Sequence, residues 1–233
     1  MVKMKVREFF NDSENRCKFK KYLKTGKSLD ILPVNTAIIA GYLDVCRAPL
    51  AGIAQRLNEV CGKKSTTVRN EFVENIFQPF ICDLLNGTPC FDKWHKELCN
   101  CIANYYSERG YRDFTIGKSQ KWINISLKYI LLYSTEGKSL EKYMEVLHVP
   151  IDRFIAPDIA DLIGFLPKYD TYKSMKTNES VIIDKNDYCW SKISDYSEYL
   201  ECQKALQRKL KNYEGEGISP IQWEFYKWLD KRS

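Results

Sequence analysis

The sequence lacks the features that identify many classes of enzyme. Its 233 residues include only two histidines, which excludes catalytic or metal sites that need several imidazoles. It has no Walker or Rossmann glycine loop, no Gly-x-Ser-x-Gly elbow, no His-Glu-x-x-His motif and no internal repeat. The groups that remain for chemistry are carboxylates, lysines, tyrosines and thiols.

Long apolar runs and cysteine frameworks are missing as well. No stretch approaches the roughly 20 apolar residues of a membrane span, and the chain begins with a charged segment, Met1 to Lys5, rather than a signal peptide. The nine cysteines are an odd number and are scattered without disulfide spacing. We therefore expect a cytoplasmic protein with reduced thiols and no membrane partner.

The histidines and cysteines also lack the spacing of metal ligands. His95 and Cys99 fall on one helix face, but Cys101 lies well round the helix and no Cys-x-x-Cys pair exists. Free cysteines are common in protein cores, where they are inert. We expect neither a metal nor a cofactor.

The overall composition is that of a soluble globular chain. Hydrophobic residues make up 44% and charged residues 28%, while the net charge of +6 permits nucleic-acid binding without requiring it. The chain is rich in tyrosine, phenylalanine and tryptophan, which suit base stacking but more often fill a core. A lysine cluster at 18–27 is typical of a solvated face, with phosphate contact as the alternative.

The hydrophobic periodicity predicts a mostly α protein of about ten helices. We expect one all-helical domain over 1–233, with a polar surface insertion at 167–188 that contains a short β ribbon and with closing helices at 189–233. The helices that we expect span 37–46, 48–60, 65–85, 91–107, 118–133, 190–210 and 221–229. We also expect basic helices within 6–22 with a break at 11–13, a short helix in the linker after Tyr133, and a short apolar segment at 159–166.

The stretch 91–155 contains the candidate site. A glycine-bearing hairpin, Arg109 to Gly117, precedes a helix that is apolar on most faces, which predicts that the helix is buried. Lys121, Asn124 and Lys128 lie at i, i+3 and i+7, so they form one polar stripe on it. Because buried lysines are costly, the stripe should face a cleft, a carboxylate or the outside.

Two residues of this stretch are candidates for catalysis. Lys121 lies in the first helical turn, where the helix dipole and burial should lower the pKa of its ammonium and make it a nucleophile. Asp152 follows Pro150, which restricts the preceding backbone. Asp152 is either a catalytic carboxylate or simply a helix N-cap. His148, beside it, is either a site residue or a turn residue.

Two motifs carry a resemblance to a known family. Gln120-Lys121 at the start of the helix and Val149-Pro150-Ile151-Asp152-Arg153 after it resemble the helix-hairpin-helix DNA glycosylases, most of all the archaeal 8-oxoguanine type. The usual Leu-Pro-Gly-Ile-Gly-like hairpin is absent, since Gly110 and Gly117 bracket six other residues in this chain. The resemblance implies two helical subdomains around a cleft, in which Lys121 attacks the sugar C1′ and Asp152 assists.

The resemblance also implies a substrate and a set of contacts. The expected activity is base excision, with or without AP-lyase activity, on a modified base flipped out of duplex or single-stranded DNA by a monomer. The predicted substrate-binding residues are Gln120, Trp122, Asn124, Lys128 and His148. The predicted DNA-backbone contacts are Arg109, Gly110, Arg112, Gly117 and Lys118.

Two other functions fit the same residues. A non-catalytic nucleic-acid-binding helical protein would use the hairpin for phosphates alone and needs a basic strip around it. A helical host-defence or interaction protein would instead expose an apolar patch. A glycosylase requires Lys121 and Asp152 to converge on one open pocket.

Overall fold

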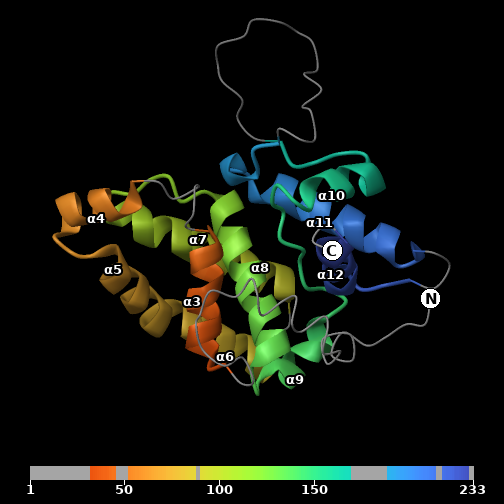
Figure 1. The fold of residues 1–233 in the computed structure, drawn as a ribbon, viewed down its shortest axis with the longest axis horizontal. Coiled ribbons are helices and arrows are strands. Elements are labelled where there is room, and N and C mark those ends of the chain that lie inside the picture. The colour runs from red at the N-terminus through yellow and green to blue at the C-terminus, as the bar shows by residue number, and fades with distance from the viewer. Residues whose placement is uncertain (1–31, 46–51, 88–89, 169–187, 214–216, 231–233) are drawn as a thin grey trace, which may run out of the picture.

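The computed structural model describes residues 32–45, 52–87, 90–168, 188–213 and 217–230 (Figure 1). Within these ranges the chain is helical and contains no strand, which confirms the mostly α prediction. The expected helices within 6–22, the lysine cluster at 18–27 and nearly all of the polar insertion lie outside the described residues.

Ten α-helices follow one another along the described ranges. They are α3 (Val34–Val45), α4 (Ile53–Cys61), α5 (Ser65–Phe72), α6 (Gln78–Gly87), α7 (Phe91–Glu108), α8 (Ile116–Tyr133), α9 (Gly137–Leu140), α10 (Ala156–Ile163), α11 (Tyr196–Leu210) and α12 (Pro220–Asp230). A π-helical segment η1 (Val73–Phe77) joins α5 to α6, and two short 3-10 helices are η2 (Glu141–Tyr143) and η3 (Trp190–Lys192).

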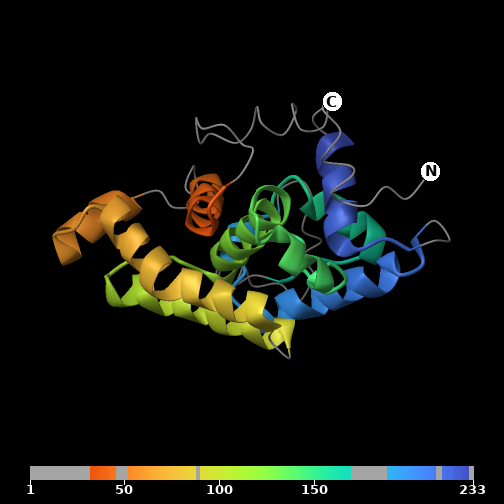
Figure 2. The ribbon, with the colours of Figure 1, turned by 90° about the horizontal axis from the view of Figure 1, so that it is seen from below.

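Helix α8 is the centre of the fold. In Figure 2, α3 lies on one side of it and α5 to α7 lie on the other. All of its residues except Leu132 are buried, as its apolar pattern predicts. Helix α3 approaches closely because Gly41 has no side chain: a Cβ there would lie 2.5 Å from Ser126 Oγ. The other helices are therefore arranged around the buried helix α8.

Trp122 of α8 lies inside an aromatic cluster. Its ring centroid is 5.4 Å from that of Phe72, 5.1 Å from that of Phe77 and 6.0 Å from that of Phe114. The indole N–H donates to the carbonyl of Ile38 at 2.8 Å, and the residue is 0% exposed. Trp122, which we predicted to contact substrate, is in this structure a core residue.

Two helix boundaries differ from the sequence-based expectation. Helix α8 begins at Ile116, before the predicted 118, because Thr115 caps it: its hydroxyl accepts from the Lys118 N–H at 3.3 Å. The predicted helix at 190–210 is wrong as a single helix. It is divided into η3 and α11, because the Asp195 carboxylate accepts from the Ser197 N–H and starts a new helix.

The described part of the chain has neither a membrane-spanning helix nor a disulfide. None of its helices is long and apolar enough to cross a membrane. Its cysteines are free thiols, and the most buried of them are Cys99 and Cys202. Burial raises the pKa of the Cys99 thiol well above its usual range, so this thiol stays protonated at neutral pH.

Candidate functional site

The structure brings Lys121 and Asp152 together. The Lys121 ammonium lies 3.1 Å from Asp152 Oδ2, and their side chains are 11% and 13% exposed. Lys121 comes from the second turn of α8 rather than from the predicted first turn, because the helix begins at Ile116. Asp152 comes from the turn before α10. The sequence predicted that the polar stripe of α8 faces a cleft, a carboxylate or the outside. For Lys121 the structure provides a carboxylate.

Asp152 uses its two carboxylate oxygens differently. Oδ1 accepts from the backbone N–H of Phe154 at 2.9 Å and of Ile155 at 3.2 Å, in the manner of a cap on the turn that leads into α10. Oδ2 faces Lys121. Asp152 therefore caps the turn that precedes α10, whose own N-cap is Ile155, and at the same time forms an ion pair with Lys121.

These contacts set the charge of Asp152. Burial by itself raises the pKa of this carboxyl, but the Lys121 ammonium and the N–H groups of Phe154 and Ile155 outweigh burial and hold the pKa below its usual value. Asp152 is therefore a carboxylate at neutral pH, able to stabilise a positive charge that develops next to it.

Two glutamine side chains hold the backbone that leads to Asp152. Gln120 of α8 accepts from the Ile151 N–H at 3.2 Å and donates to the Ile151 carbonyl at 2.9 Å. Gln203 of α11 does the same for Val149, at 3.0 and 2.8 Å. Each side-chain amide donates to and accepts from the backbone of one residue, as the backbone of a neighbouring β-strand would do. Gln120, predicted to bind substrate, is fully buried and instead fixes the position of Asp152.

Lys128 forms a second ion pair two helical turns further along α8. Its ammonium lies 2.8 Å from both carboxylate oxygens of Glu224 in α12. The two side chains are only 5% and 2% exposed, and the ammonium lies 4.7 Å from the Phe225 ring centroid and 5.5 Å from that of Trp228. Sequence reasoning missed Glu224; the available signal was one acid inside the aromatic run from Trp223 to Tyr226.

Asn124, between the two lysines on the stripe, faces other polar side chains. Its carbonyl oxygen lies 3.0 Å from Nε2 of His95, and its amide donates to Gln120 Oε1 at 3.0 Å and to the Tyr199 hydroxyl at 2.9 Å. Every one of these partners is 0% exposed. In this structure Asn124 therefore connects helices α7, α8 and α11 rather than facing solvent.

The network continues through His148 to the surface. The Tyr199 hydroxyl lies 3.1 Å from His148 Nδ1, and His148 Nε2 lies 3.1 Å from Asp92 Oδ1. This pattern assigns the proton of the neutral imidazole to Nε2, which donates to Asp92. The hydrogen bond from His148 and the ammonium of Lys204 lower the pKa of Asp92 to about 2.

Both histidines are neutral inside this network. Burial lowers the pKa of His95 well below its usual value and also lowers that of His148, which Asp92 only partly opposes. His148 is 1% exposed, and both ring nitrogens are engaged with protein atoms. His148 therefore links the side chains of Tyr199 in α11 and Asp92 in α7, rather than bonding to the backbone of the turn as one interpretation predicted.

The predicted hairpin is a loop between α7 and α8. Gly110 has a φ of +81°, and a Cβ there would lie 2.7 Å from Val60 of α4, so this position requires glycine. The Arg109 guanidinium lies 3.4 Å from the ring centroid of Tyr105 and donates to the Tyr105 carbonyl. Arg112 is exposed. These three predicted DNA contacts are at least partly accessible.

Gly117 and Lys118 are not at the surface. The Gly117 N–H donates to the carbonyl of Ile193 at 2.9 Å, and Lys118 Nζ donates to the carbonyl of Asp113. Lys118 is 5% exposed, and burial lowers the pKa of its ammonium. Because Thr115 starts α8 early, both residues fall inside its first turn, so the structure corrects the expectation that they face a phosphate.

Neither a metal site nor a relative points to a function for this site. Among the described residues, no three histidine, cysteine or acidic side chains are grouped so that they could hold a metal ion. Comparison of the chain with known protein families, with curated proteins and with solved structures finds no match. The function therefore has to be inferred from the residues of this chain.

Proposed function

We propose that the protein is a DNA base-excision glycosylase that uses Lys121 as nucleophile and Asp152 as its electrostatic partner. The observation that carries the proposal is the 3.1 Å contact between these side chains, which the family resemblance singles out from the sequence. The fixed backbone before Asp152 adds support, since catalytic groups must be held in place by their surroundings. The proposal includes a cleft between two helical subdomains that receives a flipped base.

The chemistry needs only groups that are present. Lys121 gives up one proton, and its amine attacks C1′ of the deoxyribose while the bond from C1′ to the base nitrogen breaks. The departing base takes up this proton by way of water. The sugar ring then opens as its oxygen takes a second proton from the Lys121 nitrogen, which leaves an imine on Lys121, and hydrolysis of the imine releases the lysine. Asp152 remains ionised and stabilises the positive charge on the sugar.

The imine gives the protein a second activity. It acidifies the hydrogens on C2′; when water takes one of them as a proton, the electron pair forms the C2′–C3′ double bond and the 3′ phosphate leaves by β-elimination, which is an AP-lyase step. The DNA backbone is bound by the accessible arginines of the α7–α8 loop, Arg109 and Arg112. Such phosphate contacts position the DNA and leave recognition of the base to the site.

The test is borohydride trapping with a panel of modified duplex and single-stranded DNAs. The wild-type protein is expected to form a covalent adduct with at least one DNA, because borohydride reduces the imine to a stable amine. Lys121→Gln should abolish the adduct. Lys138→Gln, which changes an exposed lysine of α9, is the matched control and should trap normally.

Two results would contradict the proposal in different ways. Base release without an adduct would mean that Lys121 is not the nucleophile and that the protein is monofunctional. Neither base release nor an adduct with any DNA of the panel would remove the glycosylase function itself.

A further inference from the structure

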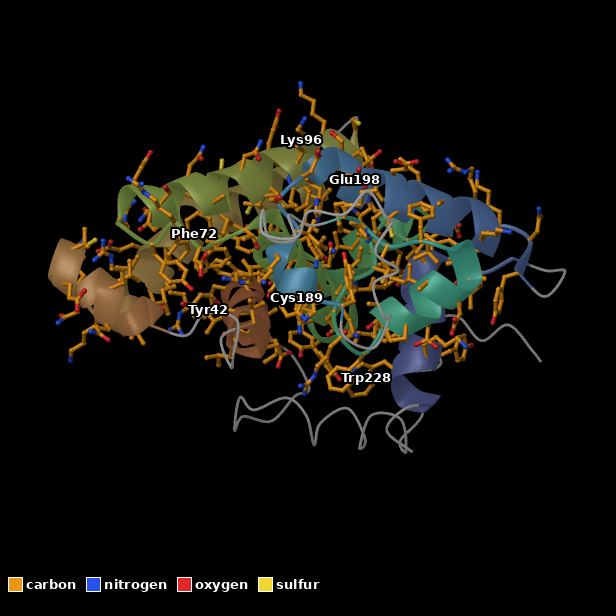
Figure 3. All side chains as sticks on the ribbon, turned by 90° about the horizontal axis from the view of Figure 1, so that it is seen from above. Tyr42, Phe72, Lys96, Cys189, Glu198 and Trp228 are labelled. Carbon is orange, nitrogen blue, oxygen red and sulfur yellow. The ribbon has the colours of Figure 1, made fainter. Side chains whose placement is uncertain are left out.

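Lys121 has a second close neighbour, the ring of Trp190. The Lys121 ammonium lies 4.5 Å from the centroid of this ring, and Trp190 itself is only 8% exposed. Trp190 belongs to η3, which packs on α8. Figure 3 labels Cys189, the residue before it, near the middle of the molecule. From its sequence alone, this segment was expected only to start a long helix.

Segment η3 is attached to the beginning of α8 by backbone contacts. The Thr115 hydroxyl donates to the carbonyl of Ser191 at 2.6 Å, and the Gly117 N–H donates to the carbonyl of Ile193 at 2.9 Å. A Cβ on Gly117 would lie 2.0 Å from the carbonyl oxygen of Trp190. No side chain fits there, so glycine at 117 lets η3 lie directly on the helix.

The ring and the carboxylate act on the same ammonium. The face of an indole attracts a cation, and this attraction grows when water is excluded. The Asp152 carboxylate attracts the same charge at 3.1 Å. The ring also covers part of a side chain that is only 11% exposed, so it limits which molecules reach the amine.

We propose that Trp190 is a positioning residue that holds Lys121 against Asp152 and shields its amine, and that Gly117 fixes the place of the ring. The part that concerns catalysis rests on the proposed glycosylase function. The part that concerns the amine does not, because the reactivity of Lys121 can be measured without DNA.

The first experiment measures how fast acetic anhydride acetylates Lys121, with mass spectrometry as the readout and Lys138 as the internal standard. Trp190→Leu should raise the rate at Lys121 about 2- to 30-fold, the range that corresponds to a cation–π contact. Trp190→Phe keeps an aromatic face and should stay near the wild-type rate. Tyr188→Leu, a buried change on the same segment, is the control for general loosening and should change the rate little.

The second experiment measures the rate of borohydride trapping at saturating DNA together with DNA affinity. Trp190→Leu should slow trapping about 10- to 100-fold, because misplacement of a reacting group by about 1 Å has an effect of this size. Affinity should stay unchanged, and Trp190→Phe should restore most of the rate. Gly117→Ala, which displaces η3, should act like Trp190→Leu in both experiments.

The outcomes separate the two proposals. Unchanged acetylation of Lys121 in a folded Trp190→Leu protein would overturn the role of Trp190, as would a phenylalanine variant that behaves like the leucine variant. If the wild-type protein traps no DNA, the glycosylase proposal fails while the acetylation rates still decide the contact. If Trp190→Leu does not fold by circular dichroism, Trp190→Met takes its place in both experiments.

Discussion

Helix α8 carries two lysine–carboxylate pairs on one face, and the two pairs are built differently. Lys121 contacts one oxygen of Asp152 at 3.1 Å, and both side chains keep more than a tenth of their surface exposed. Lys128 contacts both oxygens of Glu224 at 2.8 Å, and neither side chain is more than 5% exposed. The first pair is therefore the more accessible of the two, whereas the second is enclosed by α12.

The two carboxyl groups also differ in the direction of their pKa. Burial raises the pKa of Glu224 above its usual value, although the Lys128 ammonium opposes this. The pKa of Asp152 is lowered, because two backbone N–H groups act together with Lys121 against burial. The Lys128 pair joins α8 to α12, whereas the Lys121 pair is the one that the proposed function uses.

The largest effect is expected when the enclosed pair is broken. Glu224→Ala leaves the Lys128 ammonium buried without its carboxylate, which should lower the free energy of unfolding by about 3–5 kcal/mol. Replacement of both members, with Lys128→Met and Glu224→Leu, should recover most of this loss. Urea unfolding measures both proteins; a loss below about 1 kcal/mol in Glu224→Ala would mean that the pair does not hold the fold.

Removal of the charge from the accessible pair should affect activity more than folding. Asparagine caps a helix about as well as aspartate, so Asp152→Asn should still fold and should lose only the stability that its ion pair with Lys121 contributes. It lacks the negative charge, and we expect base release to fall about 100- to 1,000-fold while DNA affinity is kept. Single-turnover kinetics give the rate. Normal base release by a folded Asp152→Asn protein would leave Asp152 as a cap only.

A smaller effect concerns the histidine network beside the two pairs. His95 and His148 have lowered pKa values in the folded protein, so below the usual value of 6.5 the unfolded chain binds protons that the folded chain does not. Stability is therefore full above pH 6.5 and falls as the pH decreases towards the folded-state pKa values. The slope is about 1.4 kcal/mol per pH unit for each histidine.

Urea unfolding between pH 7.5 and 5.5 tests this dependence. A His95→Asn variant, which removes one of the two groups, should show about half of the wild-type slope. Asp92, whose pKa is lowered to about 2, should lose its own contribution only when the pH falls below its usual value of 3.8. Stability that stays constant from pH 7.5 to 5.5 would show that the histidines are not buried as neutral groups.

The smallest effect lies outside both pairs, in the α7–α8 loop. Arg112→Ala should weaken binding to all DNA sequences by a similar factor and reduce the slope of log affinity against log salt by about 1. Trapping at saturating DNA should not change, because both ion pairs are intact. Lys138→Ala, an exposed change on α9, is the control. An unaltered salt slope in Arg112→Ala would exclude this loop from the DNA surface.

The sequence by itself determined the local features of the protein. The spacing of apolar residues predicted the helical fold and the burial of α8, because a helix of period 3.6 places residues three and four apart on one face. The same rule placed Lys121 and Lys128 on one stripe. The helix start was predicted late, since Thr115 was not recognised as its cap.

Only the tertiary structure decided which groups these residues meet. Glu224 lies 96 positions from Lys128, and Gln203 lies 54 positions from Val149. Gly117 looked in the sequence like a flexible position that could approach a phosphate, yet it is the point where the Trp190 backbone lies on α8. Helical propensity is set by near neighbours in the chain, whereas pairing between distant residues depends on how whole helices pack, and no local pattern encodes that packing.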